Sequence, residues 1–310
     1  MTFTRVHHVS LVTGDMEEAR HVMCDGFGLS IDEHRTPWNQ GPTGGAESAT
    51  TVEFPIGEMF YAVSKPESDD SVLGQFLAST NGRGGMYYIS IASDDIIADM
   101  QRLASQGVAP KDDWDGMSPV FLDPDTCQGL LIQIRPEDHY YTHPHYRGNG
   151  VVTGMAHIGI ASRSAEEARE LWEGIFGLTE DKSKESELEP QTDEAGRAAN
   201  DPVHLVEFPL GGTVIEVSIP TSDDSGTAKM VAQKAPLGSV YHHTCPYTPD
   251  VYHFMEQATG AGLQQIGALP GREENRLPVG WLHPKSCLGM LIEVWNRPPG
   301  DDHYHVHPEL

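Results

Sequence analysis

The chain has 310 residues, which suits two domains of ordinary size, and its apolar fraction of 38% is sufficient for packed cores. Its 46 acidic and 20 basic residues give a formal net charge of -26, a balance that argues against nucleic acid or an anionic membrane surface as a partner. The sequence shows no signal peptide, no apolar run near the ~20 residues of a membrane helix and only four scattered cysteines, so it predicts a cytoplasmic protein with free thiols.

The sequence repeats itself over nearly its whole length. HHVSLVTGDMEEARHVMCDGFGLS matches AHIGIASRSAEEARELWEGIFGLT, VEFPIG matches VEFPLG, and FLDPDTCQGLLIQI matches WLHPKSCLGMLIEV. The matched segments begin at His7 and Ala156, at Val52 and Val206, and at Phe121 and Trp281. Matches in one order indicate a duplication. We therefore predict an N-terminal domain at residues 1–146 and a C-terminal domain at 151–310, with the linker near Arg147 to Gly150.

Each half is predicted to run as a strand, a helix and three strands, and then the same again. The C-terminal half begins with a strand at MAHIGIAS and a helix at SAEEARELWEGIFG, which Gly177 should end. One face of that helix is apolar, through Ala168, Leu171, Trp172, Ile175 and Phe176. Further strands are expected around HLVEFPL, GTVIEVSI, SVYHHTCPY, VGWLHP and GMLIEVW, with a second helix near DVYHFMEQATGAG. The chain would then be α+β, with four β-α-β-β-β units.

Two polar segments do not fit this pattern. Glu180 to Asp201 is nearly free of large apolar residues, and we expect it to be a mobile loop or a lid. A lid would cover the C-terminal cup, by which we mean the half-open barrel whose inward side chains could surround a cation. Arg35 to Thr50 is similar but contains more glycine.

Four side chains of the C-terminal half could together hold a metal ion. His157 and His243 lie on the first strands of their units, and Glu216 and Glu293 lie on the last strands. Each alone is more often a structural or exposed residue, but two imidazoles and two carboxylates at equivalent places suit a divalent ion such as Ni, Co, Mn, Fe or Zn.

The N-terminal half serves as an internal control. Its equivalent residues are His8, Ala62, Tyr88 and Gln133, which would hold a metal poorly. A cup built from one unit of each half would also lack part of the ligand set. The sequence therefore predicts one metal ion per chain, in a cup formed wholly by the C-terminal half.

These motifs resemble the vicinal-oxygen-chelate superfamily, to which glyoxalases and extradiol dioxygenases belong. The C-terminal half is most similar to methylmalonyl-CoA epimerases, through AHIGIAS, TVIEVSIPTSDDS, YHHT and the run HPKSCLGMLIEV. The resemblance implies two tandem glyoxalase-like domains and supports the four ligands above. Epimerases usually carry Gln in place of Glu216, and two His with two Glu look more like the glyoxalase set. A two-domain chain with metal only in its second half instead resembles extradiol dioxygenases.

Three functions follow as hypotheses. The first is an isomerase, epimerase or lyase that removes a proton next to a metal-chelated carbonyl of a small molecule or acyl thioester, with Glu293 or Glu207 as the base. The second is an Fe(II) ring-cleaving dioxygenase that uses His157, His243 and Glu293. The third is a binding protein without turnover. We expect a small-molecule substrate and neither nucleic acid nor a membrane as partner, and a homodimer stays open.

Overall fold

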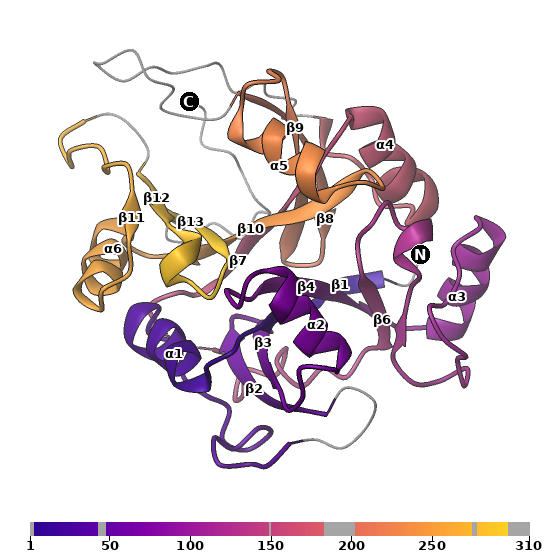
Figure 1. The fold of residues 1–310 in the computed structure, drawn as a ribbon, viewed down its shortest axis with the longest axis horizontal. Helices are drawn as coiled ribbons and strands as arrows, with labels where there is room; N and C mark the ends of the chain where they lie inside the picture. The colour runs from indigo at the N-terminus through magenta and orange to yellow at the C-terminus, as the bar shows by residue number, and fades with distance from the viewer. Residues whose placement is uncertain (1–2, 43–47, 149, 183–201, 275–277, 297–310) are drawn as a thin grey trace.

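The computed structural model describes residues 3–42, 48–148, 150–182, 202–274 and 278–296, and each half of the chain forms its own β-sheet (Figure 1). The N-terminal sheet has six strands in the order β2-β3-β1-β4-β6-β5, and the C-terminal sheet has seven in the order β11-β12-β13-β10-β7-β9-β8. The predicted α+β class is therefore confirmed, and each sheet is built within one half. The exact domain boundaries stay a prediction.

The strands and helices of the N-terminal half are β1 (Phe3–Val12), α1 (Met16–Arg20), β2 (Ala49–Ile56), β3 (Met59–Pro66), α2 (Val72–Ser79), β4 (Gly85–Ser93), α3 (Ile96–Ser105), β5 (Val120–Phe121) and β6 (Ile132–Pro136). Those of the C-terminal half are β7 (Gly154–Ser162), α4 (Ala165–Arg169), β8 (Val203–Leu210), β9 (Thr213–Pro220), α5 (Gly226–Lys234), β10 (Ser239–Thr248), α6 (Val251–Gly260), β11 (Gln265–Ile266), β12 (Val279–Leu282) and β13 (Leu291–Asn296). Wider π-helical turns extend α1 over His21–Gly26 and α4 over Glu170–Ile175.

The two sheets have the same topology. The first strands of the two units pair antiparallel, β1 with β4 and β7 with β10. Each first strand also pairs in parallel with the last strand of its own unit: β1 with β3, β4 with β6, β7 with β9 and β10 with β13. The first and last strands, which carry the predicted ligands, therefore lie side by side at the centre of each sheet.

The units differ from the prediction in two details. The second unit of the C-terminal half has all the expected elements, whereas the first unit of the N-terminal half has only two strands after its helix in the described residues. There the side chain of Asp32 accepts hydrogen bonds from the backbone N–H groups of His34 and Arg35, which favours a turn over a strand. The helices α2 and α5 were not predicted, and Ser71 and Ser225 cap their N-termini.

The helix after β7 packs as its sequence predicts. Ala168, Leu171, Trp172 and Phe176 are buried, Ile175 packs at the core's edge, and Gly177 ends the helix with a φ of +68°. One hydrophobic core runs through both halves. Tyr61 on β3 joins them where its hydroxyl lies 2.9 Å from Oγ1 of Thr244 on β10. Among the described residues, no helix combines the length and apolarity needed to cross a bilayer.

Candidate metal centre

The four predicted ligands lie on four adjacent strands of the C-terminal sheet. His157 is on β7, Glu216 on β9, His243 on β10 and Glu293 on β13, and these strands are consecutive in the order β13-β10-β7-β9. All four side chains are buried. The structure thus brings together residues up to 136 positions apart.

Three of the four predicted ligands each place one nitrogen or oxygen atom near a common point. Nε2 of His157 lies 2.8 Å from Nε2 of His243 and 2.9 Å from Oε2 of Glu293, and the third distance, from His243 to Glu293, is 3.3 Å. Bonds of 2.0 to 2.2 Å to a shared ion would place neighbouring ligand atoms roughly 2.8 to 3.6 Å apart. The donor types and their spacing therefore fit a divalent metal ion, and these three residues form the cluster of metal-binding type found among the described residues.

Glu216 lies beside this cluster of three residues. Its carboxylate oxygens lie 3.6 Å from Nδ1 of His157 and 3.6 Å from Nε2 of His243. Glu216 is thus close to both imidazoles but less tightly gathered than Glu293. Burial raises the pKa of Glu293, but the hydrogen bonds and positive charge of the two histidines outweigh it and hold that pKa well below the ordinary value of 4.5.

A glycine makes room for the ring of His243. Gly159 on β7 lies opposite both His243 on β10 and Glu216 on β9. A Cβ atom at Gly159 would lie 2.1 Å from Nδ1 and from Cε1 of His243. The imidazole therefore lies directly over the β7 backbone, and only glycine permits it there.

Two further side chains contact the predicted ligands, and sequence reasoning missed them. Nε1 of Trp295 donates a 2.8 Å hydrogen bond to Oε1 of Glu293, so that Oε2 remains for the cluster. Nδ1 of His242 lies 3.0 Å from Nδ1 of His243. Hydrogen bonds of this kind fix the orientation of metal ligands. The spacing of two residues between Glu293 and Trp295, which puts them on one face of β13, was the available signal.

The second candidate base, Glu207, also faces the cup. It is buried on β8 and lies directly opposite Glu216 on β9. Residues directly opposite one another in an antiparallel pair point to the same face of the sheet. Both oxygens of Glu293 are engaged, by Trp295 and by the histidines.

The N-terminal sheet matches the C-terminal one residue by residue. The counterpart of Gly159 is Ser10, which lies opposite Ala62 and Tyr88, just as Gly159 lies opposite two of the predicted ligands. Gln133 lies opposite Phe121, as Glu293 lies opposite Trp281. The strand register thus supports the residue equivalences predicted from the repeat.

Aromatic side chains fill the N-terminal cup. The His8 ring stacks on Phe60 with centroids 4.7 Å apart, and its Nε2 lies 3.2 Å from the hydroxyl of Tyr88. Tyr141, from the segment after β6, is buried there and donates to Glu53, the counterpart of Glu207. Arg35 makes an ion pair with Glu53 at 3.2 Å. Among the described residues, this cup therefore contains packed aromatic rings with hydrogen-bonded and ion-paired side chains rather than a cluster of metal-binding type.

Two segments of interest lie outside the described residues. Most of the predicted loop or lid, residues 183–201, is among them, although Glu180 at its start is buried and ion-paired with Arg169 at 2.7 Å. The C-terminal segment HYHVHP, which repeats the Tyr141 segment, is also outside them.

Comparisons with known proteins identify the fold and a group of relatives. Residues 5–143 match the family model of the Glyoxalase/Bleomycin resistance protein/Dioxygenase superfamily. The mitochondrial methylmalonyl-CoA epimerase of Dictyostelium discoideum is 28% identical over 140 residues, which are 45% of this chain and 76% of that protein. Uncharacterized protein YqjC of Bacillus subtilis (strain 168) is 25% identical over 149 residues, 48% of this chain and 95% of that protein.

Solved structures resemble both halves together. A mutant of 4-hydroxymandelate synthase from Streptomyces coelicolor superposes with a TM-score of 0.65 over 98% of this chain and 95% of that chain, at 13% identity. A xylose isomerase-like TIM barrel/4-hydroxyphenylpyruvate dioxygenase fusion protein gives 0.59 over 97% of this chain and 50% of that chain, also at 13% identity. At these identities the similarity shows that the fold is shared.

Proposed function

We propose that the C-terminal domain of this chain is a divalent-metal-dependent isomerase, epimerase or lyase, supported by the match of residues 5–143 to the glyoxalase/bleomycin resistance protein/dioxygenase family model and by the shared two-sheet fold. It would remove a proton from the carbon next to a carbonyl, in a small molecule or an acyl thioester. The observation that carries the proposal is the convergence of His157, His243 and Glu293, with Glu216 beside them, which among the described residues occurs in the C-terminal half alone.

These four residues would hold the metal ion, of which Ni, Co, Mn, Fe and Zn are the candidates. Bound there, the ion would supply a Lewis acid for two vicinal oxygens of the substrate. Trp295 would keep Glu293 in one orientation, and His242 would do the same for His243. Burial of the cup would exclude water from the reacting carbon.

Glu207 is the better candidate for the base. Glu293 has one oxygen bound by Trp295 and the other directed at both histidines, so it would have to leave the cluster to accept a proton. Glu207 is buried on the same face as Glu216, outside the cluster. A carboxylate in such a place can take a proton from a carbon held over the cup. Glu207→Gln should therefore keep the metal and abolish hydrogen–deuterium exchange at that carbon.

The three-residue cluster also favours a second function. Two histidines and one carboxylate are the ligand set of non-heme Fe(II) oxygenases, which leave the remaining positions open. Glu216 lies 3.6 Å from the nearest imidazole nitrogens, farther than the spacing within the cluster. A dioxygenase would use His157, His243 and Glu293 and leave Glu216 unbound.

Metal affinity of two variants separates these functions without a known substrate. If Glu216 is a ligand, Glu216→Gln should retain the metal through its amide oxygen, and Glu216→Ala should weaken binding markedly. If the protein is a dioxygenase, Glu216→Ala should bind iron nearly as well as the parent and should still consume oxygen. Glu207→Gln is the matched control, because it changes a buried carboxylate of the same face outside the cluster. Equal affinities of the parent and Glu216→Ala would rule out the isomerase or lyase proposal.

A further inference from the structure

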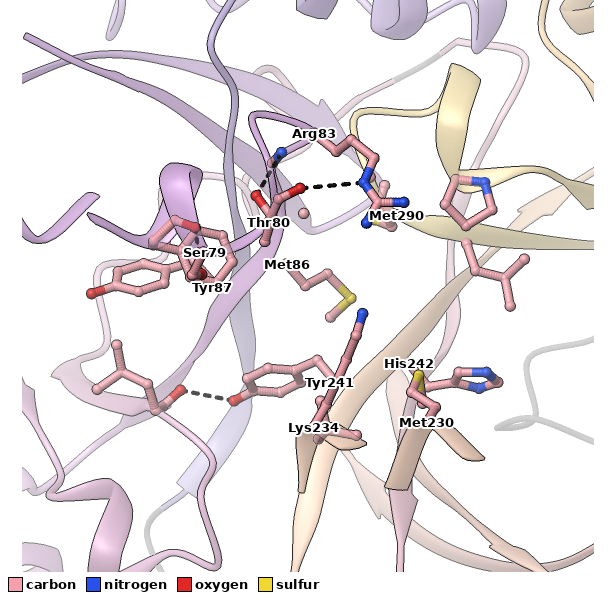
Figure 2. Close-up of a pocket in the computed structure, with 18 of the residues that line it drawn as sticks. Ser79, Thr80, Arg83, Met86, Tyr87, Met230, Lys234, Tyr241, His242 and Met290 are labelled. Carbon is pink, nitrogen blue, oxygen red and sulfur yellow. Dashed lines mark hydrogen bonds between the residues drawn. The ribbon is translucent and has the colours of Figure 1, made fainter. Parts of the chain in front are cut away.

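A large pocket lies at the junction of the two halves and is lined by residues of both (Figure 2). Its volume is about 810 Å³, within the range of ligand-binding pockets. Equivalent segments of the two repeats line it: the starts of β4 and β10, and the turns that lead into β6 and β13. The pocket therefore exists only because two copies of the domain face each other.

The charge of this junction pocket is opposite to that of the chain. Arg83 lines it from the N-terminal half, and Lys234 on α5 and Lys285 line it from the C-terminal half. The chain has 46 acidic residues against 20 basic ones, yet no acidic side chain is among those described that line this pocket. Within the described part of the chain, none of the three cations has a carboxylate partner at ion-pair distance. Three unneutralised cations around one pocket attract a multiply charged anion.

Apolar and aromatic side chains make up part of the remaining lining, beside polar ones such as Ser79, Asn81 and His283. Met86 and Met230 contribute flexible side chains, and Tyr87 and Tyr241 contribute rings. Methionine and aromatic surfaces suit the organic body of a ligand rather than a bare inorganic ion.

Neighbours of two proposed metal ligands line the pocket, although none of the four proposed ligands does. His242 lines it, and its Nδ1 lies 3.0 Å from Nδ1 of His243, while Leu291 on β13 is two residues from Glu293. A molecule held in the pocket would thus lie against residues adjacent to two of the proposed ligands.

We propose that the junction pocket binds an organic polyanion, a phosphate ester or a polycarboxylate with an apolar or aromatic body, through Arg83, Lys234 and Lys285. This site is separate from the proposed metal ligands, so it stands even if the metal-dependent reaction is wrong. When both sites act together, the pocket holds the charged part of the substrate while the reacting part lies in the C-terminal cup.

Calorimetric titration of the full chain with three probes tests the proposal. Adenosine diphosphate represents phosphate esters, benzene-1,3,5-tricarboxylate represents polycarboxylates, and adenosine is the uncharged control. We expect one of the two anions to bind, adenosine not to bind, and added salt to weaken binding. Arg83→Gln, Lys234→Gln and Lys285→Gln should each weaken binding about tenfold, as the loss of a charge-assisted hydrogen bond does.

Lys229→Gln is the matched control, because Lys229 lies on the same helix as Lys234 but does not line the pocket. It should bind the anion as the parent does. His157→Ala, which removes a proposed metal ligand, should also retain anion binding, and a loss there would assign the anion to the metal and overturn the pocket. The proposal is equally wrong if neither anion binds, if adenosine binds as tightly as the diphosphate, or if the three variants match the parent.

Discussion

Replacing Gly159 with alanine should displace His243 from the metal centre without unfolding the chain. The added carbon would lie 2.1 Å from two atoms of the imidazole, whereas non-bonded carbon contacts are optimal at roughly 3.5 to 4.0 Å. The ring would have to move by about 1 Å or more, and metal–ligand distances tolerate only about 0.2 Å.

We expect Gly159→Ala to weaken metal binding by about 100-fold or more and to cost about 1–3 kcal/mol of unfolding free energy, as overpacking does. Competition of the protein with a chromogenic chelator measures the affinity, and urea unfolding measures the stability. Gly154→Ala is the control, because it lies on the same strand and an added Cβ there meets nothing within 4 Å. Unchanged metal affinity in Gly159→Ala would refute the assignment of His243 as a ligand.

Three further predictions concern the metal content, Trp295 and His7. Elemental analysis should find one metal ion per chain, lost in His243→Ala and kept in His8→Ala; two ions per chain would contradict the asymmetry. Trp295→Phe should lower metal affinity about 10- to 100-fold with the fold intact in circular dichroism, and an unchanged affinity would remove its orienting role. Burial lowers the pKa of His7 to about 4. Between about pH 6.5 and 4 the unfolded chain therefore binds a proton at His7 that the folded chain does not, and the free energy of unfolding should fall as the pH drops through this range. The dependence of this free energy on pH, measured by urea unfolding, should be weaker in His7→Gln, and an equal dependence would contradict the prediction.

The duplication made most of the fold predictable. Matching segments in both halves located the central strands, and the apolar face from Ala168 to Phe176 located the helix after β7. The helices α2 and α5 were missed because they are short and follow the polar runs PESDDS and PTSDDS, which suggest loops. Their serine caps were the local signal, and it is weak without the tertiary contacts that stabilise a short helix.

The candidate site was predictable as a set of residue types but not as a geometry. Comparison of the two halves singled out four positions, and the structure places all four on adjacent strands. The spacing within the cluster, which separates Glu216 from the other three, depends on side-chain rotamers that no sequence pattern specifies. The junction pocket was missed because it is lined by Arg83, Lys234 and Lys285, which come from three separate segments of the chain that meet only in the folded protein.

The N-terminal half differs from the candidate metal centre in more than the ligand positions. At the position of Gly159 that half carries Ser10, which lies opposite Tyr88 as Gly159 lies opposite His243. Because a Cβ atom at Gly159 would overlap the imidazole, the Cβ of Ser10 occupies the corresponding space, and a histidine at position 88 could not lie across β1 in the same way. The space above β1 is instead closed by Phe60 stacked on His8, with Tyr141 behind it. The candidate metal centre therefore depends on an absent side chain at one strand position as well as on its ligands. The difference between glycine and serine there adds to the differences at Ala62, Tyr88 and Gln133, and together they separate a cup that fits a cation from one filled by its own side chains.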